Sequence, residues 1–262
     1  MRKVLSFELH NSKLKIQNVA FTKRRSEQTL IGILAGMGPR STAPFVDMLV
    51  DACQRQYGAR YDIDFPPMLI YALPTPFYID RPIDHAALAA IITAGLRKLE
   101  DADVAFVALP CNSAHIYFEQ LAASSHVPLL NMIDVTLGAL PNAANTVALL
   151  ATRPTVEARM YQDAIERAGK RVLAGEAWQA RVDALILAIK SASDRELARE
   201  LWRDLVADLH SAGADTLLLA CTDLNAVSAS VDTPMALIDA TRCLAEATIA
   251  QWLRIEGGEA AS

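Results

Sequence analysis

Short apolar runs alternate along the chain with longer stretches in which apolar residues recur every three or four positions. The runs predict buried strands at 30–35, 68–73, 106–109, 128–132, 146–152, 217–220 and 234–238. Most of these runs are apolar without a polar alternation, which is typical of parallel strands that helices cover on both faces. The sequence therefore predicts parallel sheets in the interior of the protein.

The stretches between the runs predict amphipathic helices. They begin at Ser41 or Thr42, at Asp84, after Cys111, at Thr155, around Asp183, at Ser193 with Glu196 in a capping box, and at Asp239. The helix from Thr155 is expected to reach Gly169, and the helix around Asp183 to end at Lys190. Strand and helix thus alternate throughout, which predicts an α/β fold with right-handed crossovers.

The length of 262 residues favours two domains over one. We expect two similar α/β domains, each a parallel sheet flanked by helices, at 29–130 and 131–235, with 236–257 packing back on the first. Residues 1–28 hold seven basic and two acidic side chains and form a basic N-terminal extension. A solvated tail is the favoured interpretation of that extension, and a docking arm the other.

Composition narrows the class of protein. Hydrophobic residues make up 52% and charged residues 21% of the chain, as in compact globular proteins. No apolar stretch reaches the roughly 18 residues that a membrane span needs, and no signal peptide is evident, so we expect a cytoplasmic protein. The net charge is −5, and −10 without the basic extension, which argues against nucleic acid as a partner.

Two of the predicted strands lead into a cysteine that a polar residue follows. These cysteines are Cys111 and Cys221. Open parallel sheets bind ligands outside the carboxyl ends of their strands, so both thiols fall where a substrate would lie. A helix beginning just after Cys111 would place its thiol at the positive end of a helix dipole and favour ionisation. The active site is therefore expected in a cleft between the two domains.

The structural alternative is that these cysteines are small core residues. Free cysteine is among the most buried residue types, and this interpretation is preferred for Cys53 and Cys243, which lie at apolar positions of predicted helices. For Cys111 and Cys221 the matching polar contexts outweigh it. A disulfide between them is disfavoured, because cytosolic proteins seldom keep one.

Two loops on the same side of the predicted sheets could contact a ligand. The turn 36–39 offers backbone N–H groups to an anion. It does not match a dinucleotide fingerprint, since Ser41 stands where a third glycine is needed. Arg81 is the only cation of the proline-rich loop 74–82, and a guanidinium can bind a carboxylate with two parallel bonds.

Four motifs together resemble those of the aspartate/glutamate racemase family, the cofactor-independent amino-acid racemases that include hydantoin racemases. They are Gly36-Met37-Gly38-Pro39, Pro110-Cys111-Asn112-Ser113-Ala114-His115, Leu150-Ala151-Thr152-Arg153-Pro154-Thr155 and Ala220-Cys221-Thr222-Asp223. The similarity covers about residues 30–255. The chain departs from the family pattern at Ala35 and Ala220, where glycine is usual, and at Asp223, where glutamate is usual.

The resemblance implies an amino-acid racemase without a cofactor or metal, acting on aspartate or glutamate, with the site in the inter-domain cleft. Cys111 and Cys221 would be the two acid/base thiols. The implied substrate-binding residues are Met37, Gly38, Arg81, Asn112, Ser113, Ala114, Thr152, Lys190 and Thr222. A small-molecule amino acid is the expected partner, and a homodimer the expected assembly.

The chemistry agrees with this implication. Racemisation removes the α-proton on one face and returns a proton on the other, so a thiolate and a thiol on opposite sides suffice. Without an electron sink, backbone N–H groups with Asn112, Thr152 and Thr222 would have to stabilise charge on the substrate carboxylate.

Other functions remain open from the sequence. A thiol hydrolase would use Cys111 with His115, and a one-thiol isomerase or decarboxylase would use one cysteine of the same fold. A non-catalytic protein that binds a small molecule in the cleft is the alternative of another class. Metal binding through Cys111, His115 and Cys221 is disfavoured, because their spacing lacks paired ligands.

Overall fold

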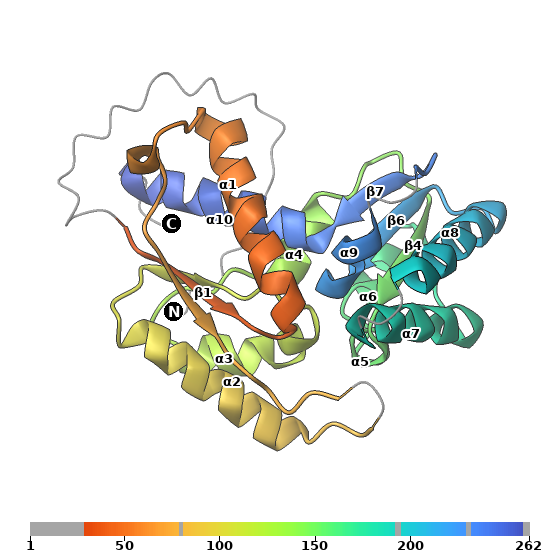
Figure 1. Ribbon diagram of the computed structural model, residues 1–262, viewed down its shortest axis with the longest axis horizontal. Helices are drawn as coiled ribbons and strands as arrows, with labels where there is room; N and C mark the ends of the chain where they lie inside the picture. Colours follow the sequence, from red (N-terminus) through yellow and green to blue (C-terminus); the bar gives the residue numbers. More distant parts are fainter. Residues whose placement is uncertain (1–28, 79–80, 192–194, 229–231, 259–262) are drawn as a thin grey trace.

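The computed structural model describes residues 29–78, 81–191, 195–228 and 232–258. It contains two parallel sheets with helices on both faces (Figure 1). One sheet has the strand order β2-β1-β3, and the other has the order β5-β4-β6-β7. The predicted α/β fold is thereby confirmed. The basic extension 1–28 lies outside the described residues.

The first sheet consists of β1 (Ile31–Ala35), β2 (Met68–Ala72) and β3 (Phe106–Ala108). β1 lies between the other two strands and is completely buried, as its unbroken apolar run predicts. One face packs against α1 (Thr42–Tyr57) and α10 (Ala240–Glu256), and the other against α2 (His85–Glu100) and α3 (Phe118–Ser124) (Figure 1).

The second sheet is formed by β4 (Thr146–Ala151), β5 (Arg171–Leu173), β6 (Thr216–Ala220) and β7 (Ala236–Asp239). α7 (Glu176–Ser191) and α8 (Arg195–Ser211) cover one face. α4 (Met132–Gly138) and α6 (Gln162–Arg167) contribute to the core on the other face, and the short helices α5 (Arg153–Glu157) and α9 (Asn225–Ser228) complete this half.

The segment expected to return to the first domain, 236–257, divides between the two sheets. Its strand β7 pairs with β6 in the second sheet, whereas its helix α10 packs against α1 and α4. Asp239 caps α10 by accepting a hydrogen bond from the Thr241 N–H, as the sequence predicts. The domain boundaries themselves stay a prediction.

Several predicted elements were wrong in detail. The helix expected directly after Cys111 is a 3₁₀-helix, Ser113–Tyr117, that precedes the seven residues of α3. The run 128–132 makes only an isolated bridge, between Val107 and Leu129, because α4 begins at Met132. The helix expected from Thr155 to Gly169 is broken into α5 and α6, and Arg159 between them has a left-handed φ of 52°.

Ser193, the first residue of the expected capping box, lies outside the described residues. Within the described residues, α8 begins at Arg195. The strand β5 and the helix α4 were not predicted from the pattern. None of the helices in the described ranges is both long and apolar enough to cross a membrane.

Candidate active site

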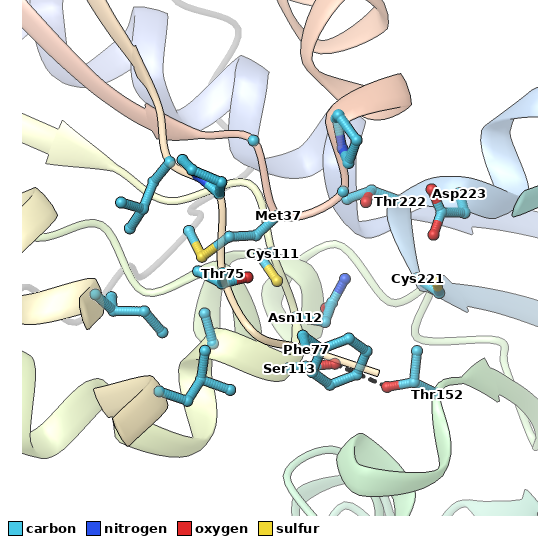
Figure 2. A pocket seen from close by; sticks show the side chains of 18 of the residues that line it. Met37, Thr75, Phe77, Cys111, Asn112, Ser113, Thr152, Cys221, Thr222 and Asp223 are labelled. Atoms are coloured by element: carbon cyan, nitrogen blue, oxygen red, sulfur yellow. Dashed lines mark hydrogen bonds between the residues drawn. The ribbon is translucent and has the colours of Figure 1, made fainter. Parts of the chain in front are cut away.

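The carboxyl ends of strands from both sheets meet at one cavity of about 390 Å³. The segments after β1, β2 and β3 form one side, and those after β4 and β6 form the other (Figure 2). The residues that line it are Gly36, Met37, Gly38, Pro39, Ala72, Leu73, Pro74, Thr75, Phe77, Leu88, Ile92, Cys111, Asn112, Ser113, Ala114, Thr152, Lys190, Ala220, Cys221, Thr222 and Asp223. Residues from both halves of the sequence thus build a single site.

The structure brings together all but one of the site residues that the sequence singled out. Both cysteines and eight of the nine expected substrate-binding residues line the cavity. Arg81 does not. Its guanidinium lies 4.5 Å from the centre of the Tyr78 ring, beside a second hollow that His85 and Arg153 also line. In this conformation Arg81 is not placed to bind a ligand between the two thiols.

Cys111 lies shortly after the end of β3 at Ala108 and directly after Pro110, which has no backbone N–H to continue the strand pairing. Burial raises the pKa of the Cys111 thiol to about 11, although the N–H groups of Ala114 and Ser113 and the charge of Lys190 act in the opposite direction. A five-residue 3₁₀-helix follows in place of the expected α-helix, and burial outweighs the effect of the N–H groups at its start. The thiol is therefore harder to ionise than the sequence predicted.

Cys221 follows β6 and forms the N-cap of the 3₁₀-helix Thr222–Leu224. Burial, together with the negative charge of Asp223, raises the pKa of its thiol to about 12. A thiolate formed at either position would be a stronger base than a cysteine thiolate in water. That property suits the removal of a weakly acidic proton bound to carbon.

Asn112 offers the cavity a hydrogen-bond donor. Its Oδ1 accepts a bond of 2.5 Å from the hydroxyl of Tyr161, and burial raises the pKa of Tyr161, which keeps that hydroxyl protonated. The Nδ2 atom of Asn112 is buried and has no hydrogen-bond partner within the described residues. Figure 2 shows this nitrogen directed toward the space between Cys111 and Cys221. A buried amide without a partner is costly, so the position favours a ligand that accepts from it.

Hydroxyl groups join the two halves at the cavity. Ser113 Oγ lies 2.8 Å from Thr152 Oγ1, and both contact Thr155 Oγ1, at 3.2 and 3.0 Å (Figure 2). Across the site, Thr222 donates to Ser41 Oγ at 3.1 Å, and Ser41 donates to the Gly38 carbonyl. The hydroxyl proton of Thr222 is therefore not available to a substrate carboxylate unless this bond breaks.

Lys190 and Asp223 form an ion pair inside the site. Lys190 Nζ lies 2.6 Å from Asp223 Oδ2, and the Asp223 side chain is only 6% exposed. A Cβ atom on Gly38 would lie 3.2 Å from Asp223 Oδ1 and 3.4 Å from Lys190 Nζ. Glycine at this position lets the turn after β1 approach the ion pair closely.

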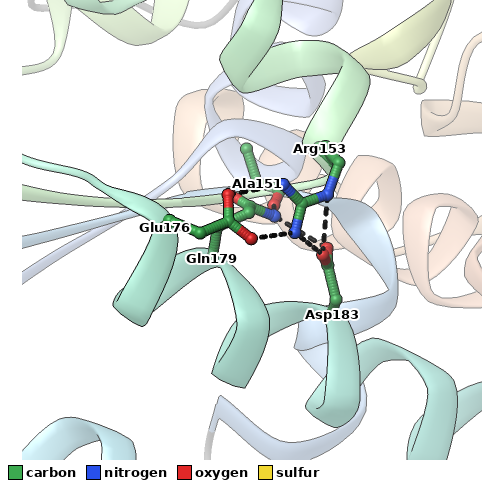
Figure 3. Close-up of polar contacts among 5 residues, drawn as sticks. All are labelled: Ala151, Arg153, Glu176, Gln179 and Asp183. Atoms are coloured by element: carbon green, nitrogen blue, oxygen red, sulfur yellow. Dashed lines mark hydrogen bonds and ion pairs between the residues drawn. The ribbon is translucent and has the colours of Figure 1, made fainter.

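The network around Arg153 fixes the wall that carries Lys190. The Arg153 guanidinium donates two bonds to Glu176, of 2.7 and 2.9 Å, and two to Asp183, of 2.8 and 3.1 Å (Figure 3). Gln179 donates to Asp183 and to the last carbonyl of β4. This network holds α7 against the end of β4. Because Lys190 lies in the last turn of α7, the network also fixes the helix that carries Lys190.

His115 holds the backbone of Cys111 in place and does not itself line the cavity. Its Nε2 accepts from the Met132 N–H at 3.0 Å, so the ring proton is on Nδ1, which donates to the Cys111 carbonyl at 2.9 Å. Burial lowers the pKa of His115 to about 4, and the ring stays neutral. Both ring nitrogens are occupied by backbone groups, which argues against His115 as the base of a thiol hydrolase.

The sequence identified only part of the apolar lining. Met37, Leu73, Phe77, Leu88 and Ile92 line the cavity and belong to the hydrophobic cluster between β1 and α2. Met37 was an expected site residue, but the apolar spacing of Leu73, Leu88 and Ile92 could only be interpreted as core. Asp223 was recognised as part of a motif, but its ion pair with Lys190 was not foreseen. Within the described ranges, no three His, Cys, Asp or Glu side chains gather as metal ligands.

Comparison with known proteins agrees with the cysteine motifs. The family model described as Asp/Glu/hydantoin racemase matches residues 34–248. The chain belongs to this family. The resemblance seen in the four motifs is thereby confirmed.

Relatives of this racemase family match most of the chain. The broad specificity amino-acid racemase RacX of Bacillus subtilis is 43% identical over 224 residues, which cover 86% of this chain and 98% of that protein. The Picrophilus torridus aspartate racemase structure shares 25% identity with a TM-score of 0.75, covering 88% of this chain and 99% of that one. A Francisella tularensis glutamate racemase in complex with D-glutamate, 14% identical with a TM-score of 0.64, covers 90% of this chain and 84% of its own and supports the fold.

Proposed function

We propose that the protein is a cofactor-independent racemase that interconverts the L and D forms of an amino acid through Cys111 and Cys221. The observation that carries this proposal is the meeting of the two thiols, from the strand ends of two different sheets, at one cavity. The sequence relatives named as amino-acid and aspartate racemases support the same chemistry.

In the proposed step, the thiolate of one cysteine takes the α-proton, and the electron pair of the broken C–H bond stays on the α-carbon. The thiol of the other cysteine then gives its proton to the opposite face of that carbon. One thiol and one thiolate remain, with their roles exchanged, so the atoms and charges balance. Burial raises the pKa of both thiols, so each thiolate is a strong base when formed.

The polar groups suit the two charged ends of an amino acid. Nδ2 of Asn112 can donate to the α-carboxylate, and donation to this group stabilises the negative charge that develops on deprotonation. The Asp223 carboxylate can accept from the α-ammonium group. We assign the α-carboxylate to Asn112 rather than to the Thr222 hydroxyl, whose proton is engaged with Ser41.

The test is to incubate single amino-acid enantiomers in deuterated water while following α-deuteration and optical rotation. The wild type should deuterate the α-carbon and lose optical rotation. Cys111→Ser and Cys221→Ser should each lose racemisation, because each turnover needs both faces. Cys53→Ala, which removes a thiol in the core of the first half, should keep it.

Two outcomes would overturn the proposal. Full racemisation in both directions by either serine variant would exclude the two-thiol mechanism. Binding of amino acids by the wild type without any α-deuteration would instead identify a binding protein. The expected homodimer and cytoplasmic location stay predictions, which sedimentation velocity and cell fractionation can test.

A further inference from the structure

Apart from the two thiols, the described residues that line the cavity carry no net charge, and the thiolate that the proposed step requires would add one negative charge. Lys190 is the one cation and Asp223 the one anion among them, and the two pair at 2.6 Å. An amino acid with a neutral side chain is itself a zwitterion without net charge. A second carboxylate on the substrate would enter a buried space whose cation already has a partner, which is costly.

The lining divides into a polar and an apolar side. The polar side holds Asn112, Thr152, Thr222 and Asp223 from segments that follow strands, and Lys190 from the last turn of α7. The apolar side is formed by the tip of the turn after β1, the segment after β2 and one face of α2, and its residues are Met37, Leu73, Phe77, Leu88 and Ile92. Figure 2 shows Met37 beside Cys111, on the side of the site away from Asp223.

These two sides fit the two parts of an amino acid. If the α-carboxylate contacts Asn112 and the α-ammonium group contacts Asp223, the side chain extends toward the apolar side. Burial of an aliphatic or aromatic side chain there is favourable by ~1.5–3 kcal/mol. A cavity of about 390 Å³ is within the usual range for small-molecule sites, so a larger side chain has room.

We infer that the substrates are amino acids with uncharged apolar side chains, of the size of leucine or methionine, rather than aspartate or glutamate. This inference rests on the proposed racemase function and adds the class of side chain. The sequence motifs favoured acidic substrates, but the charge of Lys190 is already balanced by Asp223, and the residues of the apolar side offer a second carboxylate no cation.

The experiment compares L-leucine, L-asparagine and L-aspartate, which have the same number of non-hydrogen atoms and the same branching. They differ mainly in the polarity and charge of the group at the end of the side chain. We expect kcat/KM for leucine to exceed that for asparagine by about 10-fold or more, and that for aspartate by a larger factor. Equal or higher kcat/KM for aspartate would overturn the inference.

A variant tests the position of the side chain. Met37→Lys replaces a half-buried, unbranched side chain by one of similar length that ends in a cation. The ratio of kcat/KM for aspartate over leucine should rise about 10-fold or more in this variant. Met48→Lys, at a half-buried position of α1 that does not line the cavity, is the matched control and should leave the ratio unchanged.

The outcomes separate the two proposals. If the wild type deuterates no amino acid, the racemase function itself fails. If it deuterates aspartate at least as well as leucine, the function stands and the substrate class is wrong. An unchanged ratio in a folded Met37→Lys protein would also contradict the inference, and the wild-type comparison alone decides it if that variant does not fold.

Discussion

The hydrogen bond from Tyr161 to Asn112 gives a sharp test of how the site holds a substrate. Tyr161 is fully buried, and its hydroxyl donates to Asn112 Oδ1. This bond orients the amide so that Nδ2 is directed into the cavity. We predict that Tyr161→Phe, which keeps the ring and removes only the hydroxyl, lowers kcat/KM.

The expected size follows from what the amide loses. Without the hydroxyl, Asn112 Oδ1 is buried without that partner, and the amide can rotate away from the substrate carboxylate. A hydrogen bond to a charged group contributes ~1.5–3 kcal/mol, which corresponds to a fall of about 10- to 150-fold in kcat/KM. The substitution keeps the buried ring, so we expect the free energy of unfolding to fall by only ~1–2 kcal/mol and the melting temperature by a few degrees.

The assay is α-deuteration at several substrate concentrations, with thermal unfolding measured on the same samples. Tyr57→Phe is the matched control, because Tyr57 donates to the Asp64 carbonyl at 2.7 Å and does not line the cavity. In an Asn112→Ala background, Tyr161→Phe should have almost no further effect, since both changes remove the same interaction. A folded Tyr161→Phe protein with kcat/KM within about twofold of the wild type would refute the reasoning.

Four further predictions concern the two thiols, His115 and Gly38. Burial raises the pKa of Cys111 to about 11 and of Cys221 to about 12, so kcat/KM should rise with pH above neutrality as thiolate forms, and a plateau already at pH ~8 would contradict this. The unfolded thiols ionise at lower pH, so stability should fall as the pH rises above their ordinary pKa of 9.0, measurably less in a double Cys→Ser variant. His115→Phe should lower the free energy of unfolding by ~1–3 kcal/mol for each backbone group that loses its partner, as denaturant unfolding can measure. Gly38→Ala should reduce kcat/KM at nearly unchanged melting temperature, because the new Cβ would lie 3.2 Å from Asp223 Oδ1, and unchanged kinetics would show that the turn can retreat.

The periodic pattern was sufficient to predict six of the seven strands in the described residues, all but β5, and the place of both thiols at strand ends. The apolar runs before Cys111 and Cys221 have no polar alternation, and strands buried on both faces require such runs. The pattern was insufficient where the local backbone geometry decides whether a helix continues or ends. Nothing in the apolar spacing of 155–169 signals the left-handed Arg159 that separates α5 from α6.

The parts of the site that depend on contacts between distant residues could not be predicted. Lys190 and Asp223 are each recognisable alone, but their ion pair depends on how α7 ends relative to β6. The same holds for Tyr161, whose role follows only from its bond to Asn112, 49 positions away in sequence. Arg81 shows the opposite case, since its place in a loop after β2 suggested a ligand contact, whereas its side chain lies over the Tyr78 ring and does not line the cavity.

The two thiols lie in different surroundings, since Cys111 packs against the apolar cluster between β1 and α2, whereas Cys221 belongs to the core between β6 and α7 and is followed closely by Asp223. Enantiomers have equal free energies in water, so the equilibrium constant of a racemisation is one. It follows that kcat/KM must be equal in the two directions, for the wild type and for every active variant. The asymmetry of the site can therefore appear only in how each direction divides this value between kcat and KM, which makes the two pairs of constants a readout of the different environments of the two thiols.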